Sequence, residues 1–197
     1  MRSAARLSSL FVLGAVLGTA GDQLHVRSGV LSYARPSPLL FGQALWVPLL
    51  FGAAGVLLVL GHAPLLRLTR ERSARASAFG FAAAVLWFYG AYASTALFAG
   101  ARLALTAALV AAWVARVAAA PAADKVLAGV LWAIAGPLFE AALSATGAFQ
   151  YRRPDVLLVP AWLPALYLHV SLMTREAYLV FFGARREAVE ATAPDRR

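Results

Sequence analysis

The chain contains no cysteine, which excludes disulfide bonds, a thiol nucleophile and cysteine-based metal sites. It also has few charges: charged residues make up 14% of its 197 residues, whereas apolar residues make up 61%. The mean hydropathy is +0.72. The charges fall in short gaps between apolar runs of about 20 residues, the length that an α-helix needs to cross the hydrocarbon core of a bilayer. The sequence therefore leaves no room for a separate water-soluble catalytic domain.

Familiar catalytic motifs are absent as well. The sequence has no His-Glu-x-x-His, no Gly-x-Ser-x-Gly, no Walker loop and no clustered aspartates of the kind that hold Mg²⁺. Its three histidines lie on different segments without metal-ligand spacing. We therefore predict a protein that is not an enzyme, with no catalytic residue, no metal and no cofactor other than a bound lipid. An enzyme of lipid metabolism that uses Asp22 or Glu140 as acid or base is a weaker alternative.

The apolar runs predict an all-α polytopic membrane protein. We expect one domain, residues 1–183, followed by a charged cytoplasmic tail, residues 184–197. Asp124 is placed at the N-cap of the fifth span, and the first span is expected to be retained although its small residues suggest a signal-peptide cleavage site. The six expected transmembrane helices cover approximately residues 7–26, 38–60, 74–98, 103–119, 124–146 and 159–183.

Basic residues are distributed unequally between the two sides of this six-span arrangement. Twelve lysines and arginines fall on the side that holds both termini, and five fall on the other side. The positive-inside rule then places both termini in the cytoplasm. The same rule, together with attraction to anionic lipid headgroups, accounts for the net charge of +9 without a nucleic-acid partner.

Polar side chains inside apolar spans are costly, so they are candidates for a binding site. Asp22, Gln23 and His25 lie near the outer end of the first span, and Glu140 is the deepest acid, in the fifth. Two other interpretations remain open. Asp22 and His25 could anchor a helix end at the membrane interface, and a protonated Glu140 could join two helices by a hydrogen bond.

The predicted site is a crevice among the first five spans that holds a neutral lipid, diacylglycerol-like or sterol-like. Pro48, Pro137 and Pro164 are expected to interrupt their helices and open this crevice. The predicted polar mouth consists of Asp22, Gln23, His25, Gln43 and Glu140, and the predicted apolar contacts are Phe41, Leu45, Trp46, Phe79 and Phe139.

Three segments in series resemble the Insig family, the polytopic membrane proteins of sterol regulation, which also has bacterial homologues. Residues 21–26 (GDQLHV) resemble its Asp-x-Leu-x-Val motif, and residues 44–48 (ALWVP) its Trp-Val-Pro motif. The third segment spans residues 147–164 and is similar to the family's outer-loop sequence. The residues that match the second and third motifs, and that fit a fold signature, are Pro48, Gly147, Gln150, Tyr151, Asp155, Trp162 and Pro164.

The resemblance implies a six-span fold, cytoplasmic termini and a non-enzymatic role in lipid sensing. Animal members bind oxysterols and hold membrane-protein partners, and bacterial members resemble binders of a two-tailed lipid such as diacylglycerol. Glu140 falls where animal members carry a cavity glutamine, so the resemblance implies a ligand contact there. A bacterial homologue would lie in the inner membrane. Residues 116–119 lack the partner-binding aspartate of animal members, so sterol-pathway partners are not implied.

Other functions remain possible on the sequence alone. A small transporter or scramblase would use the proline-broken helices. A scaffold would recruit a membrane-protein partner through the basic loop at residues 67–75 or through Arg185 and Arg186. Small residues, such as Gly52 with Gly55 and Ala107 with Ala111, would permit close packing within the chain or a homo-oligomer.

Overall fold

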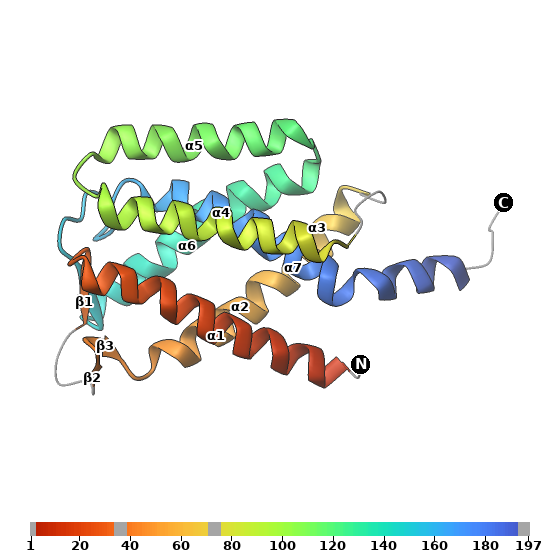
Figure 1. Cartoon of the computed structure of the whole chain (residues 1–197), viewed down its shortest axis with the longest axis horizontal. Coiled ribbons are helices and arrows are strands. Elements are labelled where there is room, and N and C mark those ends of the chain that lie inside the picture. The colour runs from red at the N-terminus through yellow and green to blue at the C-terminus, as the bar shows by residue number, and fades with distance from the viewer. Residues whose placement is uncertain (1–2, 34–38, 71–75, 193–197) are drawn as a thin grey trace.

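The computed structural model describes residues 3–33, 39–70 and 76–192, and it shows a bundle of long helices that run nearly along one axis (Figure 1). Arg72 and Arg75, and the side chains of Arg185 and Arg186, lie outside the described residues. The helices are α1 (Ser3–Arg27), α2 (Val47–Leu60), α3 (His62–Leu68), α4 (Ala78–Leu97), α5 (Arg102–Ala119), α6 (Ala123–Ala145) and α7 (Leu163–Thr192).

Within residues 3–33, 39–70 and 76–192, five stretches are long and apolar enough to cross a membrane: α1, α2 with α3, α4, α5 and α6. The sixth long helix, α7, is more polar because it carries His169, Arg175 and Glu176. It contacts α2, α3, α4, α5 and α6, so these groups face protein rather than lipid. The prediction of an all-α membrane bundle is confirmed. The polar residues of α7 are tolerated because the surrounding helices shield them from lipid.

Two features near helix starts differ from the sequence-based predictions. The second long helix begins at Val47 rather than near Pro38, because residues 39–44 form a hairpin of β2 (Leu39–Leu40) and β3 (Gln43–Ala44). Pro48 and Pro164 lie in the first turns of α2 and α7, where a proline costs no helical hydrogen bond, so they begin these helices instead of interrupting them. Within the described residues, Pro137 is the proline inside a long helix.

The strands lie together at one end of the bundle, and α1 begins and α7 ends at the opposite end (Figure 1). Antiparallel pairing joins β1 (Leu31–Tyr33) to β4 (Phe149–Tyr151), with Ser32 opposite Gln150. The hairpin β2–β3 turns at Phe41 and Gly42, both with positive φ. We call the end that carries the strands the outer end, in keeping with the charge distribution, and the opposite end the inner end.

Glycines bring α1 and α2 into close contact. A Cβ atom on Gly14 would lie 2.8 Å from the carbonyl oxygen of Phe51, and one on Gly52 would lie 2.7 Å from the ring of Phe11. Gly55 packs against Gly14 in the same way. The small residues of this pair of helices therefore serve packing within the chain.

Candidate functional site

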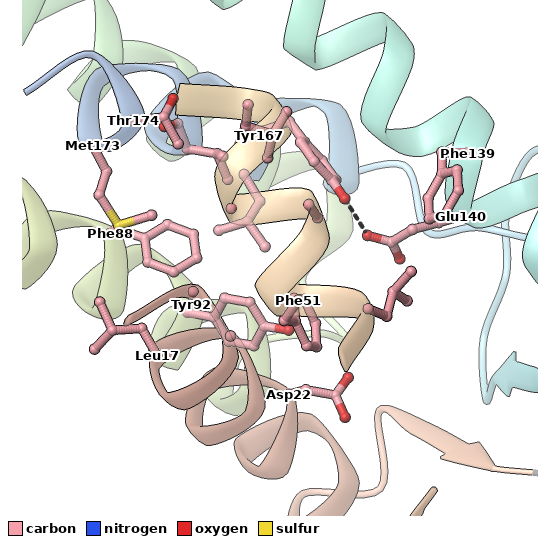
Figure 2. Close-up of a pocket in the computed structure, with 18 of the residues that line it drawn as sticks. Leu17, Asp22, Phe51, Phe88, Tyr92, Phe139, Glu140, Tyr167, Met173 and Thr174 are labelled. Carbon is pink, nitrogen blue, oxygen red and sulfur yellow. Dashed lines mark hydrogen bonds between the residues drawn. The ribbon is translucent and has the colours of Figure 1, made fainter. Parts of the chain in front are cut away.

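A cavity lies between α1, α2, α4, α6 and α7, and β1 and β4 border its outer end (Figure 2). It comprises about 1320 Å³ of empty space, its open side included. Its wall is mostly apolar because each surrounding helix turns leucines, valines or aromatic rings towards it. The wall includes Leu10, Leu17, Phe51, Leu58, Phe81, Phe88, Phe139, Leu166 and Val170.

Asp22 forms one polar point of this wall. Its Oδ2 accepts hydrogen bonds from the Tyr33 hydroxyl at 2.8 Å and from Gln43 Nε2 at 2.5 Å. Burial, and then the nearby Asp22 carboxylate, raise the pKa of Tyr33, so that phenol stays protonated and donates. The Gln43 amide also donates to the Thr19 carbonyl, which fixes it behind the acid. Oδ1 of Asp22 accepts no hydrogen bond from the described side chains.

Glu140 forms the second polar point. It accepts a hydrogen bond from the Tyr167 hydroxyl at 2.7 Å, drawn in Figure 2, and another from the Tyr151 hydroxyl. Tyr151 comes from β4 and Tyr167 from α7, so the carboxylate of α6 joins three elements. Glu140 therefore joins elements by hydrogen bonds, as one interpretation of the sequence predicted, and it also lines the cavity; its contact with a ligand stays a prediction.

The cavity is polar at these two acids and carries no opposite charge. None of the described residues that line it is lysine, arginine or histidine. A phosphate group would meet two carboxylates and no cation there, whereas hydroxyl groups can donate hydrogen bonds to both. The wall thus suits a ligand with an apolar body and a neutral, hydrogen-bond-donating head.

Several predicted contacts lie away from the cavity. Phe41, Leu45 and Phe79 are 76%, 55% and 84% exposed on the outside of the bundle, where they would meet lipid. Gln23 donates to the Phe41 carbonyl instead of facing the cavity. Phe79 was misplaced because a helix that is apolar on all sides gives no sequence signal for its inward face. Phe41 and Leu45 were misplaced because they lie in turns before α2 rather than in a helix.

His25 is also not part of the cavity wall. It is buried, stacks on Tyr92 with ring centroids 4.2 Å apart, and hydrogen-bonds through Nε2 to Thr95 Oγ1 at 2.8 Å. Its role is packing between α1 and α4. Of the predicted lipid contacts, the structure places Asp22, Trp46, Phe139 and Glu140 on the cavity wall, and Gln43 behind Asp22.

Four tyrosines of the cavity wall were not among the predicted lipid contacts: Tyr33, Tyr92, Tyr151 and Tyr167. Tyr151 was predicted only as part of a fold signature, and the other three are not acidic or basic, so they stood out less. The signal for Tyr167 was available, because a phenol in a span needs a hydrogen-bond partner. Tyr167 meets Glu140 because Gly136, one turn before that acid, leaves room for its ring.

The other residues of the fold signature lie around the outer loops. Asp155 accepts from Arg102 and from the Ala161 amide, and Trp162 is buried against the ring of Tyr151. Gly147 has a φ of +79°, which suits the turn after α6. Gln150 is exposed on β4.

A separate polar cluster lies at the inner end. Asp124 is fully buried and accepts from Arg175 Nε at 2.5 Å, and Arg175 also pairs with Glu176 at 3.0 Å. Asp124 lies in the first turn of α6 and Ala122 is the N-cap, so the predicted capping role is wrong. Nearby, His62 Nε2 hydrogen-bonds to Thr174 Oγ1 at 2.9 Å.

The fold and its enclosed site define a polytopic α-helical membrane protein with an internal apolar cavity. No family model matches the sequence. An INSIG protein homolog from Mycolicibacterium vanbaalenii is 35% identical over 151 residues, which cover 74% of this chain and 70% of that protein. The chain therefore belongs to the Insig family, and the sequence resemblance is confirmed.

Solved structures of a mycobacterial Insig homologue, MvINS from Mycobacterium vanbaalenii, show the same fold. One is similar with a TM-score of 0.77 at 26% identity, covering 94% of this chain and 97% of that one. Another, with a TM-score of 0.77 at 27% identity and the same coverage, is of a cross-linked MvINS trimer.

Proposed function

We propose that this protein binds one neutral lipid in the cavity and acts as a lipid-sensing or lipid-holding membrane protein without catalytic activity. The observation that carries the proposal is the pairing of an apolar wall with two carboxylates, Asp22 and Glu140, and no basic side chain among the described lining residues. A diacylglycerol-like or sterol-like molecule fits, because its hydroxyl can donate to a carboxylate while its tails or rings bury apolar surface.

We infer three further properties. The distribution of basic residues supports cytoplasmic termini, and the bacterial relative supports the inner membrane. The trimer reported for MvINS supports a homo-oligomer, with Ala107 and Ala111 exposed on α5 as candidate packing residues. A membrane-protein partner that responds to the bound lipid would complete a sensing role.

The test is quantitative mass spectrometry of lipids extracted from protein purified in mild detergent. We expect about one molecule of a single neutral lipid class per chain. Glu140→Leu should lower this occupancy about tenfold, because it removes the hydrogen-bond acceptor of the head. Glu140→Gln retains an acceptor for Tyr151 and Tyr167 and should lie between the two.

A pair of neighbouring alanines provides the matched control. Ala54 lines the cavity, whereas Ala53 is exposed on the same helix. Ala54→Phe should exclude the lipid tail, and Ala53→Phe should leave occupancy unchanged. Bulk membrane lipids in equal amounts in all four variants and the parent would show that the cavity holds no specific lipid.

A further inference from the structure

A groove runs along the outside of the bundle between α4 and α5, apart from the cavity. Figure 1 shows α5 separated from α4 along its length, and His169 of α7 forms the floor between them. The groove comprises about 1200 Å³ of empty space, its open side included. Except for Ser94 and His169, its lining residues are apolar or glycine.

Small residues make this groove open. Ala101 at the N-cap of α5 and Ala104, Ala108 and Ala112 within it recur every three or four residues and form one wall. On α4, a Cβ atom added to Gly90 would meet nothing within 4 Å. From Ala101 to Ala112 the wall rises about 16 Å at about 1.5 Å per residue. That length is close to the depth of one leaflet, about half of a 30 Å hydrocarbon core.

A permanent cation, Arg116, lies one turn of α5 beyond Ala112 and contacts two residues that line the groove, Trp87 and His169. The Arg116 guanidinium lies 5.2 Å from the ring centroid of Trp87, and its Nη1 donates to His169 Nδ1 at 3.1 Å. Because Nδ1 accepts this bond, His169 carries its proton on Nε2 and donates to the Leu109 carbonyl at 3.0 Å. His169 therefore positions Arg116 without neutralising its charge.

Arg116 has no acid in direct contact, although Glu176, which pairs with Arg175, interacts with it at longer range. Arg102 pairs with Asp155, and Arg175 pairs with Asp124 and Glu176. Among the described side chains, none places a carboxylate within 4.0 Å of Arg116, and none accepts from its Nε or Nη2. A charged group at membrane depth requires a counter-ion.

A second copy of the chain would not supply that counter-ion from its described side chains. Asp22 and Asp124 are buried, Glu140 is bound by two tyrosines, and Asp155 and Glu176 are paired with arginines. An anionic lipid matches both parts of this site, because its phosphate is negative where Arg116 is positive and its acyl chain is apolar like the groove wall.

We propose that this groove binds one anionic phospholipid. Its phosphate accepts hydrogen bonds from Arg116, and one acyl chain lies along the groove from Ala112 towards Ala101. The site is separate from the cavity, which has two acids and excludes phosphate, so one chain holds a neutral lipid inside and an anionic lipid outside.

Native mass spectrometry of the detergent-solubilised protein tests this site. The protein is titrated with phosphatidylglycerol and with phosphatidylcholine of the same acyl chains. We expect the first phosphatidylglycerol to bind about tenfold more tightly. Arg116→Gln should abolish this preference, Arg116→Lys should retain part of it, and Gly90→Leu should weaken the binding of both lipids by filling the groove.

Two controls separate the site from its surroundings. Arg67→Gln and Arg70→Gln each remove an exposed basic residue near the inner end, and both should leave the preference intact. An unchanged preference in Arg116→Gln overturns the proposal. A second outcome also overturns the proposal: the parent protein shows no preference for phosphatidylglycerol, and Gly90→Leu and Arg116→Gln lose their oligomers. That outcome identifies the groove as a subunit interface.

Discussion

The two carboxylates of the cavity each receive hydrogen bonds from residues far away in the sequence. Asp22 of α1 binds Tyr33 and Gln43, and Glu140 of α6 binds side chains of β4 and α7. Each acid therefore lines the cavity and also joins elements of the outer end, so a replacement can affect both the proposed ligand binding and stability. The choice of replacement at these positions can separate the two effects.

At Asp22 we predict that Asp22→Leu costs about 1–3 kcal/mol in the free energy of unfolding, because the Tyr33 hydroxyl and the Gln43 amide lose their acceptor. Asp22→Asn keeps one carbonyl oxygen and should cost less. Thermal unfolding in detergent measures both, with Gln23→Leu as the control on an exposed hydrogen bond. Equal midpoints for Asp22→Leu and Asp22→Asn would contradict this role.

Part of the site could be predicted from single residues. Asp22 and Glu140 stood out because charges are rare in apolar spans. The pairing of Arg175 with Asp124 could not be predicted, because the two residues are 51 positions apart and a partner at that distance has no sequence signature. Phe79 was predicted to line the cavity but lies on the outside of the bundle, because the sequence does not distinguish an aromatic ring that faces lipid from one that faces a cavity.

Among the elements, α7 is exceptional because a polar helix occupies the centre of the bundle. Its Arg175 is 6% exposed and its partner Asp124 is fully buried, so the pair fixes α6 against α7 at the inner end. Because both side chains are buried, water cannot take the place of either partner in this ion pair.

We predict that Asp124→Ala destabilises the protein by about 3 kcal/mol, because Arg175 loses its buried partner and keeps only the less buried Glu176. The double variant Asp124→Leu with Arg175→Met should recover most of this loss. Arg102→Gln, at the more exposed Asp155 pair, should cost no more than about 1 kcal/mol. Unfolding in a denaturing detergent series gives all three values, and an equal loss for the single and double variants would disprove the ion-pair explanation.

The contact between α6 and α7 sets the position of Tyr167. A Cβ atom on Gly136 would lie 2.1 Å from the Tyr167 ring. Gly136→Ala should therefore displace the ring, break its bond to Glu140 and cost about 1–3 kcal/mol through overpacking. Lipid occupancy should fall with it. Gly90→Ala, where the added methyl group meets open space, is the control and should leave both quantities nearly unchanged.

The elements themselves were largely predictable because each long apolar run became a helix. The start of α2 was not, since residues 39–46 are nearly as apolar as the helix that follows. The direction in which each helix faces could not be predicted either. Packing at Gly14 and Gly52, rather than an apolar stripe, decides how α1 meets α2.

For the whole molecule, the orientation in the membrane is directly measurable. Because the chain has no cysteine, single introduced cysteines report without background. Leu157 is 65% exposed near the outer end, and Arg70 is exposed after α3 at the inner end. A membrane-impermeant maleimide should label Leu157→Cys in intact spheroplasts, and Arg70→Cys only after permeabilisation. The reverse pattern would place the termini outside.

The pairing of β1 with β4 also sets how late during synthesis the outer end and the cavity can be completed. Leu31 pairs with Tyr151, 120 residues later, and the cavity needs wall residues from α7 as well. At about 5–20 residues per second, the ribosome takes roughly 6–24 s to synthesise that interval. During this time α1 and α2 lie in the membrane before the other helices of the cavity wall have been made. Membrane lipid then occupies the space in which the cavity will form. The lipid proposed for the cavity would thus be available before the cavity closes, and it could be enclosed during synthesis rather than admitted afterwards.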